Sequence, residues 1–263
     1  NKLANLKVTA LNISKDKILW IGTDGNGLIQ IYPKDNYFGV LTKIGGTNVN
    51  KPIRAFSEDN GDLWVGTKGN GVLIFQKFWQ SNSEVNSPKK IDISNGLDNN
   101  SVFTLKKGID QLTYIGTDGR GITIYDQKSK QTISWKSIKG TEKLPDFRSV
   151  YAIIQERDSS VWLGTSGYGL IQLKIGRNPD QSLIVKSFKQ YYSSSIEKKG
   201  PANDIIYALV KGKDNRLWIA CRYGGLSVLE PKSKTFKTFK AFGYSESLSH
   251  SDVLSLFYDR KNG

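Results

Sequence analysis

One motif recurs five times along this chain of 263 residues, and it limits the possible folds more than any other feature. Each copy is an apolar run with one aromatic residue, followed by closely spaced glycines, as in LWIGTDGNGL at residues 19–28. The other copies are LWVGTKGNGV (63–72), TYIGTDGRGI (113–122), VWLGTSGYGL (161–170) and the divergent LWIACRYGGL (217–226). Such self-similarity indicates that each copy belongs to one supersecondary unit, which buries its apolar faces against its neighbours.

A second signature lies 11 or 12 residues before each of these aromatic residues. Short apolar runs begin there, with the sequences VTAL, IRAF, VFTL, VYAI and IYAL, and their first residues are Val8, Ile53, Val102, Val150 and Ile206. Four copies also carry an aspartate four residues before the aromatic residue, namely Asp16, Asp110, Asp158 and Asp214. The pattern begins a sixth time with Val253 in register and stops before another aromatic run arrives.

Each unit is predicted to contain four short strands. The apolar VxAL run is the first strand, the aromatic run is the second, a third follows the glycines, and a looser outer strand such as TISWKSI or KTFKTFKAF ends the unit. Four strands in a repeat of 44 to 56 residues are typical of a β-propeller blade. We therefore predict an all-β propeller of five four-stranded blades plus the first strand of a sixth, as a fragment of a larger, about seven-bladed propeller.

The whole of 1–263 is predicted to be one propeller segment. Its blades are expected at residues 5–48, 49–98, 99–146, 147–202 and 203–249, with a partial blade at 250–263.

The glycine-rich loops are predicted to be tight corners rather than ligand loops. A phosphate-binding loop leads into a helix, whereas GTDGNG leads into the strand-like LIQIYP. A calcium loop needs several carboxylates, and the residues that replace Asp24 in the other copies are Lys68, Asp118, Ser166 and Arg222. Glycine itself persists, which suits positions of positive φ or of close backbone approach.

Composition narrows the function classes. No apolar run approaches the roughly 20 residues of a membrane-spanning helix, and residues 1–10 lack the apolar core of a secretory signal. Cys221 is the single cysteine and His250 the single histidine, so we expect no disulfide, no metal and no cofactor. The formal charge of +14 indicates either that the chain binds polyanions or that it has a lysine-rich, solvated surface. Because methionine is absent even at position 1, we expect a segment of a longer protein.

The combination NxxV…D…LWIGTxGxGL…Y resembles the two-component regulator propeller repeat. The resemblance covers all five units and departs at Tyr114, which replaces Trp, and at Ala220 and Cys221, which replace Gly-Thr. Such repeats form the extracytoplasmic sensor region of hybrid two-component systems, in which a histidine kinase and a response regulator share one chain. The resemblance implies a periplasmic sensing segment that is not itself an enzyme and that belongs to a sensor histidine kinase.

The resemblance also implies partners. Relatives often sense oligosaccharides, and an acidic or sulfated one is favoured here if the positive charge gathers at the site. A homodimer would form through the full-length protein, and the membrane would be reached only through other parts of the parent chain. Direct binding of nucleic acid by this segment is not expected, because no recognised nucleic-acid module accompanies the charge.

A ligand is predicted to bind where the glycine corners meet the segments that lead into the next blade, around the mouth of the central channel. The candidate ligand-binding residues are Arg54, Lys68, Asn70, Asp118, Arg120, Arg148, Tyr168, Arg222 and Tyr223. The strongest are the aromatic residues and arginines at the corners, because rings stack on sugar faces and arginine pairs with carboxylates or sulfates. These are Arg120, Tyr168, Arg222 and Tyr223. The loops also contain Asp24, Asn203 and His250.

The tryptophans are predicted to be structural, and no residue is predicted to be catalytic. Trp20, Trp64, Trp162 and Trp218 recur at one position, which predicts packing between blades rather than ligand stacking. No catalytic residue is predicted, since an enzyme needs converging acid and base groups or a metal cluster. The main alternative to a sensor is a scaffold that binds protein on one face without a small ligand, because fold alone does not define function.

Overall fold

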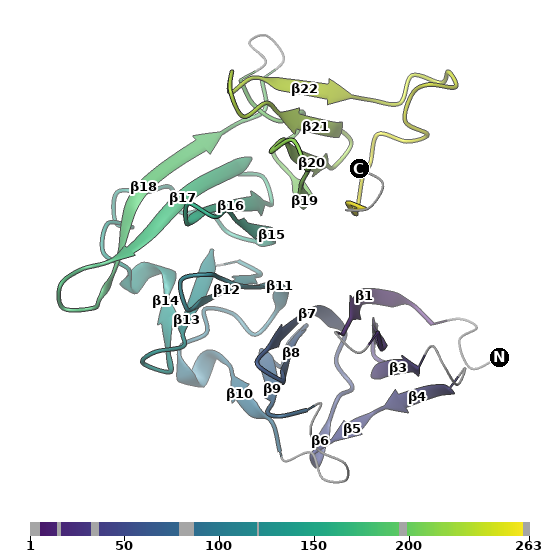
Figure 1. Cartoon of the computed structure of the whole chain (residues 1–263), viewed down its shortest axis with the longest axis vertical. Coiled ribbons are helices and arrows are strands. Elements are labelled where there is room, and N and C mark those ends of the chain that lie inside the picture. The colour runs from purple at the N-terminus through teal and green to yellow at the C-terminus, as the bar shows by residue number, and fades with distance from the viewer. Residues whose placement is uncertain are drawn as a thin grey trace. The chain divides into compact units, whose positions relative to one another are not determined.

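The repeat folds into separate four-stranded sheets. The computed structural model describes residues 6–14, 17–32, 37–78, 87–119, 121–194 and 199–259. Within these residues it contains five four-stranded antiparallel sheets and one two-stranded hairpin (Figure 1). In each sheet the four strands lie side by side in chain order, which confirms the four-stranded unit predicted from the repeat.

The first three sheets follow one another from the N-terminus. The first contains β1 (Val8–Ile13), β2 (Leu19–Thr23), β3 (Leu28–Tyr32) and β4 (Tyr37–Leu41). The second contains β7 (Ile53–Asp59), β8 (Asp62–Thr67), β9 (Val72–Phe75) and β10 (Lys89–Ile91). The third contains β11 (Val102–Lys107), β12 (Leu112–Thr117), β13 (Ile122–Asp126) and β14 (Gln131–Ser134).

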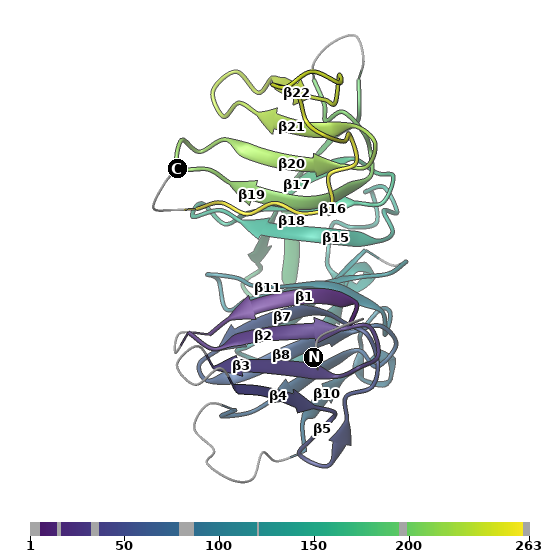
Figure 2. The ribbon, with the colours of Figure 1, turned by 90° about the vertical axis from the view of Figure 1, so that its right-hand side faces the viewer.

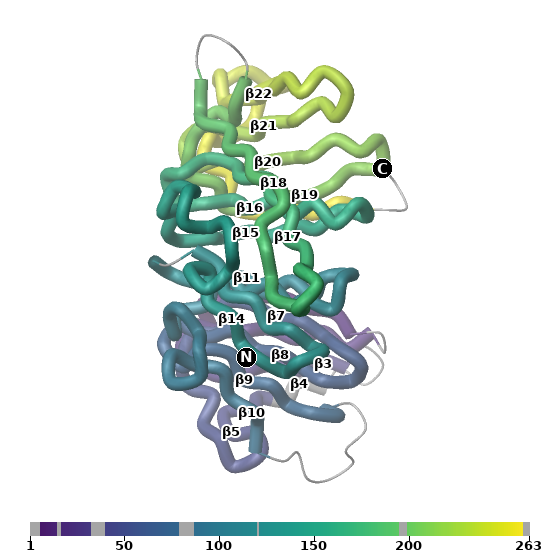
Figure 3. The backbone as a smooth tube through the Cα atoms, turned by 90° about the vertical axis from the view of Figure 1, so that its left-hand side faces the viewer, coloured from purple at the N-terminus to yellow at the C-terminus, as the bar shows by residue number. Residues whose placement is uncertain are grey.

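The last two sheets are formed by the C-terminal half of the chain. The fourth contains β15 (Val150–Gln155), β16 (Ser160–Thr165), β17 (Leu170–Arg177) and β18 (Leu183–Tyr191). The fifth contains β19 (Ile206–Lys211), β20 (Leu217–Cys221), β21 (Gly225–Leu229) and β22 (Phe236–Phe239), stacked in that order in Figure 2. Strands β17 and β18 form the longest hairpin among the described residues, as the tube in Figure 3 traces.

The chain divides into two compact units. Unit 1 comprises Asn1–Asp118 and Ile122–Ser134, and unit 2 comprises Gly119–Gly121 and Trp135–Gly263. Unit 1 therefore contains the first three sheets, and unit 2 contains the last two.

Four short elements were not predicted. In unit 1, β5 (Lys43–Ile44) pairs with β6 (Thr47–Asn48), and a 3₁₀ turn η1 (Ile93–Asn95) follows β10. The stretch TISWKSI was predicted to be a single outer strand, but β14 ends at Ser134 and a second 3₁₀ turn η2 (Trp135–Ser137) follows. The side chain of Trp135 is buried and packs on Phe147, with ring centroids 5.1 Å apart, so burial of one large ring overrides the strand pattern.

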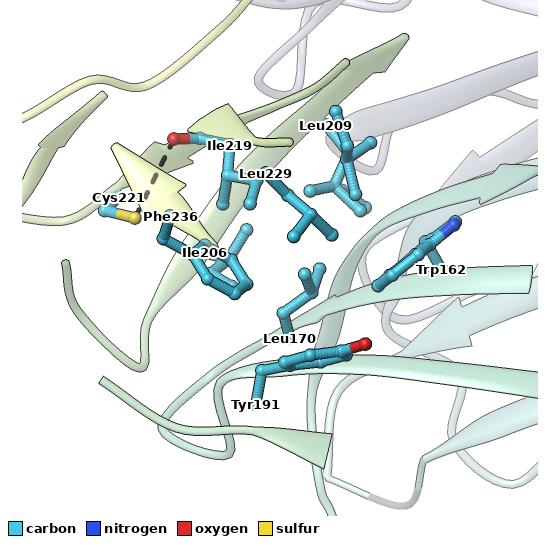
Figure 4. Packing of buried hydrophobic residues seen from close by; sticks show 11 residues of the cluster. Trp162, Leu170, Tyr191, Ile206, Leu209, Ile219, Cys221, Leu229 and Phe236 are labelled. Atoms are coloured by element: carbon cyan, nitrogen blue, oxygen red, sulfur yellow. Dashed lines mark hydrogen bonds between the residues drawn. The ribbon is translucent and has the colours of Figure 1, made fainter. Parts of the chain in front are cut away.

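The aromatic residue of the second strand packs against the following sheet within each unit. In unit 1, Trp20 is fully buried in a cluster with Ile53 and Phe75, and Trp64 packs edge-on against Tyr125 at 5.2 Å. In unit 2, Trp162 lies in a cluster that includes Ile206, Leu209, Leu229 and Phe236 of the next sheet (Figure 4). The prediction that the tryptophans pack between sheets is confirmed at these three positions.

The glycine of the LWIGT run permits this packing. A Cβ on Gly66 would lie 2.8 Å from Val102, and a Cβ on Gly164 would lie 2.7 Å from Ile206, the first residue of the next sheet's first strand. Such distances are too short for a methyl group, so the neighbouring sheets approach each other closely only because the side chain is missing. The fifth sheet has the fully buried Ala220 at this position.

The corners between the second and third strands connect each sheet to the chain that follows. In unit 1 the amides of Gly69 and Gly71 both donate to the carbonyl of Asn100 at 2.9 Å. In unit 2 the amides of Gly167 and Gly169 both donate to the carbonyl of Asp204 at 3.0 Å. The corners are therefore structural, as predicted, and these two are tied to the segments that enter the next sheets.

A threonine closes the same corners from inside. The hydroxyl groups of Thr23, Thr67 and Thr165 donate to the carbonyls of Gly27, Gly71 and Gly169 at 2.6, 2.9 and 2.7 Å. In the fifth sheet Cys221 replaces this threonine, and its buried thiol lies 3.9 Å from the hydroxyl oxygen of Ser227.

The recurring aspartate shapes the turn at the opposite end of the strands. The carboxylates of Asp110, Asp158 and Asp214 accept from the backbone amide two residues later, at 3.3, 3.0 and 3.1 Å. The residues between have positive φ: Gln111 62°, Ser159 65° and Asn215 62°. An Asx turn of this kind suits a tight hairpin, so the repeated carboxylates stabilise turns. Asp16 lies outside the described residues.

Residues 250–263 were predicted to begin a sixth unit, and the described ones among them, 250–259, form an entering segment without a strand. The amide of Gly225 donates to the carbonyl of Ser251 at 2.7 Å, as the earlier corner glycines do to their entering segments. The amide of Val253 donates to the carbonyl of Cys221 at 3.3 Å, but this single bond does not extend into the hydrogen-bond ladder that defines a strand.

Two glycines of the β16–β17 corner differ in how closely other atoms approach them. Gly169 has φ +68°, and a Cβ there would lie 2.2 Å from the carbonyl oxygen of Tyr191. Gly167 has φ +90°, and a Cβ there would meet nothing within 4 Å. Gly167→Ala should therefore cost only the left-handed strain of about 1–2 kcal/mol, whereas Gly169→Ala should cost about 3 kcal/mol or more because the carbonyl must also move. Urea unfolding of the two variants measures the difference, and equal losses would contradict the steric account.

Candidate ligand-binding face

The first strand of every sheet carries a β-bulge at the same place, close to the corners. The pairing register shifts across the second residue of each VxAL run. The residues at this position are Thr9, Arg54, Phe103, Tyr151 and Tyr207. A bulge re-aims a side chain and often lies beside a functional site. The position is therefore one where a constant backbone presents different chemistry in each sheet.

In unit 1 the bulge residues contact one another. The guanidinium of Arg54 lies over the ring of Phe103, 4.4 Å from its centroid, and its Nη1 donates to the hydroxyl of Ser101 at 3.4 Å. The hydroxyl of Thr9 donates to the carbonyl of Ile53, directly before Arg54. The arginine is thus half-buried and held flat on an aromatic ring, an arrangement that suits its planar group.

Three predicted site residues of unit 1 meet around Ser101. Arg54 reaches its hydroxyl, Lys68 forms a β-bridge with it, and the amide of Asp118 donates to its carbonyl at 2.8 Å. Asn70 lies half-buried in the same corner as Lys68, where its amide donates to Thr67 Oγ1 at 3.0 Å. The structure therefore brings these four candidates together within unit 1.

Asp24 adds the one carboxylate at the N-terminal corner of unit 1. Its Oδ2 forms an ion pair with the Lys7 ammonium at 2.9 Å. The hydrogen bond from Lys7, together with the more distant charges of Lys68 and Arg54, holds the pKa of Asp24 below its ordinary value. The candidate cations of unit 1 thus act on one common carboxylate.

In unit 2 three tyrosines and an arginine form the corresponding group. The rings of Tyr151 and Tyr207 lie 5.7 Å apart at 39°. Arg222 lies over the ring of Tyr223, 5.2 Å from its centroid, and the Tyr223 side chain is 64% exposed. Arg222 and Tyr223 were both predicted site residues, and the structure places them beside each other at the β20–β21 corner.

The backbone around Tyr223 is unusual. Tyr223 has φ 50°, a left-handed conformation that costs a non-glycine residue about 1–2 kcal/mol. Its amide donates to Asp252 Oδ1 at 3.3 Å, and the amide of Asp252 donates to His250 Nδ1 at 2.9 Å. The imidazole of His250 is therefore engaged with the backbone of the entering segment, in which it has a structural role. We refer to Tyr151, Tyr207, Arg222, Tyr223 and Asp252 as the tyrosine–arginine cluster.

Charges within the tyrosine–arginine cluster are coupled. Burial raises the pKa of Tyr207, the Arg222 cation opposes that rise, and the Asp252 carboxylate adds to it. A hydrogen bond with the Tyr223 side chain and the proximity of Tyr207 raise the pKa of Arg222. Arg222 therefore stays charged and remains exposed beside a ring, which is the pairing expected of a site for an acceptor-rich or anionic ligand.

The other candidates of unit 2 lie at earlier corners or in the segments that enter the sheets. Tyr168 is half-buried, and its carbonyl accepts from the Gln190 side-chain amide at 2.8 Å. Arg148 is exposed just before β15, and its carbonyl accepts from the Gly121 amide at 2.7 Å. Asn203 accepts from the Ile205 amide at 2.8 Å, so its side chain shapes a turn. Arg120 lies outside the described residues, and its role as a site residue stays a prediction.

Four residues of these groups were not predicted as site residues, namely Phe103, Tyr151, Tyr207 and Asp252. A signal for three of them was present in the VxAL runs, where the second residue varies between otherwise constant apolar neighbours. A strand pattern alone places that residue on one face of the sheet, and only the bulge turns it toward the corners.

The described part of the chain contains no cluster of three His, Cys, Asp or Glu side chains placed to hold a metal. Among the described residues we find no helix with the length and hydropathy needed to span a bilayer.

Solved structures resemble the chain over nearly its whole length. The extracellular domain of BT4673 from B. thetaiotaomicron, described as a one-component or a hybrid two-component system, is 19% identical with a TM-score of 0.69 over 97% of this chain. The extracellular domain of BT3049 from the same organism, described as a hybrid two-component system, is 18% identical with a TM-score of 0.59 over 98%. PorZ, a surface component of the type-IX secretion system of Porphyromonas gingivalis, is 15% identical with a TM-score of 0.65 over 95%.

These likenesses establish the fold. They confirm the all-β propeller with five four-stranded blades, and they include extracellular propeller domains of hybrid two-component systems. The chain spans 31%, 38% and 36% of the lengths of BT4673, BT3049 and PorZ, as a segment of a larger propeller protein would. No protein-family model and no curated protein matches the sequence.

The coupling between Tyr207 and Arg222 can be measured by titration. Because the Arg222 cation lowers the pKa of Tyr207, Arg222→Gln should raise that pKa further above the ordinary value of 10.0. A raised tyrosine pKa stabilises the folded state below the unfolded pKa, and the contribution is lost as pH rises through the folded value. NMR titration of the tyrosine Cζ signals, assigned with Tyr207→Phe, measures the shift.

A matched control is Arg216→Gln, which removes one charge from the same sheet at the opposite end of its strands. Arg216 pairs with Asp214 at 2.9 Å and Glu230 at 2.8 Å. The Tyr207 titration should be unaffected by this change, and a shift of similar size in both variants would contradict the assigned coupling.

Proposed function

We propose that this chain is the extracytoplasmic, periplasmic ligand-sensing segment of a hybrid two-component signalling protein. The observation that carries the proposal is the tyrosine–arginine cluster at the corner end of a fold shared with extracellular domains of such systems. The kinase and the transcriptional response lie outside this chain, and a homodimer of the full-length protein would transmit the signal.

We propose an oligosaccharide, acidic or sulfated, as the ligand. Exposed Tyr223 offers a ring face for stacking on a sugar, and Arg222 beside it offers a fork for a carboxylate or sulfate. In unit 1, Arg54 on Phe103 and the neighbouring Lys68 repeat the same pairing of cation and ring. The net charge of +14 would assist the approach of an anionic glycan.

A protein-binding scaffold is the second candidate. It is supported by Phe242 and Tyr244 after β22, whose stacked rings have centroids 5.8 Å apart and whose side chains are 64% and 60% exposed. An exposed aromatic pair of this kind is a common anchor in protein interfaces.

Thermal unfolding in the presence of neutral, uronic and sulfated oligosaccharides tests the sensor proposal. A ligand at 100 times its Kd stabilises the folded state by about 2.7 kcal/mol, which should raise the Tm by about 5 °C for a chain of this size. We expect one acidic class to raise the Tm at both low and high salt, and Arg222→Gln with Tyr223→Ala to abolish the rise.

The control variant is again Arg216→Gln, which should leave the rise intact. A rise with every polyanion that disappears at high salt would reduce the site to a charged surface. No rise with any glycan would favour the scaffold.

A further inference from the structure

A cavity lies in unit 2 at the opposite end of the strands from the tyrosine–arginine cluster. Its volume is about 1000 Å³, and it is formed by the β15–β16 and β19–β20 turns together with Trp162, Lys234 and Tyr258. No predicted site residue lines it. The proposed sensor function makes no use of this cavity.

Two buried hydrogen-bonding groups at this cavity have no partner among the described residues. Trp162 is 2% exposed, and neither its indole Nε1 nor the hydroxyl of Tyr258 makes a hydrogen bond. In Figure 4 the Trp162 ring lies against the apolar cluster while its nitrogen points away from the labelled apolar side chains. An indole N–H can only donate, and an unpaired buried donor costs about 1–3 kcal/mol. An occupant with an acceptor at this place would recover that loss.

The charges around the cavity favour a negative acceptor. Its two acids are already engaged, since Glu156 pairs with Lys211, and Asp158 pairs with Lys174 at 3.1 Å. The remaining cations of the lining are Arg157, Lys213 and Lys234, and no described carboxylate forms an ion pair with them. The cavity therefore presents donors and surplus positive charge.

Gln155, Gln172 and Asn215 add polar groups to the lining, and a further part of the wall is apolar. Ile154, Leu217, Leu229 and Pro231 line the cavity beside the indole ring. An inorganic ion would leave this wall in contact with water and would fill little of the volume. The lining combines unpaired cations with a group of apolar side chains, which suits a molecule that has one charged end and an apolar body.

We propose that this cavity is a binding site for a small organic carboxylate with an apolar body. The carboxylate accepts from Trp162 Nε1 and lies near Lys213 and Lys234, and the body packs on Leu217 and Leu229. This site is independent of the oligosaccharide site proposed at the corners.

Benzoate serves as the probe, and the indole ¹H–¹⁵N NMR signals serve as the readout. The chain contains six tryptophans, so the Trp162 signal is one of a small set and is assigned with Trp162→Phe. We expect benzoate to shift the Trp162 signal in a saturable manner and by more than the other indole signals. Benzamide, its neutral counterpart of similar shape, should shift it little.

Charge variants identify the site without altering the buried indole. Lys213→Gln with Lys234→Gln should weaken benzoate binding by at least about fivefold, since two charge contacts are removed. Lys136→Gln with Lys143→Gln removes the same charge from exposed positions elsewhere in unit 2 and should leave the affinity unchanged. Arg222→Gln should also leave it unchanged, which separates this site from the corner site.

Several outcomes would overturn the proposal. Equal shifts of all indole signals would indicate non-specific association, and equal binding of benzamide would exclude recognition of the carboxylate. Saturable shifts with inorganic phosphate as strong as those with benzoate would reduce the site to one for simple anions. Absence of any shift up to solubility would remove it altogether.

Discussion

The hydrogen bonds from corner glycine amides to the segment entering the next sheet underlie the rest of this structure. Gly71 donates to Asn100 in unit 1, and Gly169 donates to Asp204 in unit 2. The same glycines lie so close to a carbonyl of their own sheet that no side chain fits. One short stretch of backbone therefore fixes a corner, closes a sheet and positions the start of the following strand. Because backbone groups fix the corner, the side chains between the corner glycines can differ from one repeat to the next.

This arrangement explains where functional variety is found. Corner residues such as Arg222 and Tyr223, and bulge residues such as Arg54 and Tyr207, vary on a repeated backbone and lie at one end of the strands. At the other end the repeated aspartates form Asx turns, and their carboxylates are occupied by backbone amides. Carboxylates that recur in a sequence are natural candidates for chemistry, and here geometry assigns them to turns.

Much of the fold could be predicted from the sequence. The repeat indicates both the strands within a unit and the residues that pack against the next unit. The strand order, the corners and the packing of Trp20, Trp64 and Trp162 follow from spacing alone.

The site was only partly predictable. Arg222 and Tyr223 are adjacent in the chain, but the meeting of Arg54, Lys68 and Asp118 at Ser101 depends on three-dimensional pairing. Tyr207 was missed because a bulge breaks the alternation on which strand reasoning depends. The 3₁₀ turn at Trp135 likewise arises from tertiary burial, which a strand pattern does not encode.

Because of Ala220, the fifth repeat differs from the second and fourth in how closely the next sheet can pack against it. Where Gly66 and Gly164 stand, an added methyl group would overlap the next sheet, yet the fifth repeat carries that methyl group. Copies of the fifth repeat placed in tandem would therefore need a wider spacing than copies of the second or fourth. A designer assembling a uniform array from this chain would choose the second or fourth repeat as the module and use the fifth as a terminal cap. Because of this single methyl group, the fifth repeat cannot replace the second or the fourth without moving the neighbouring sheet.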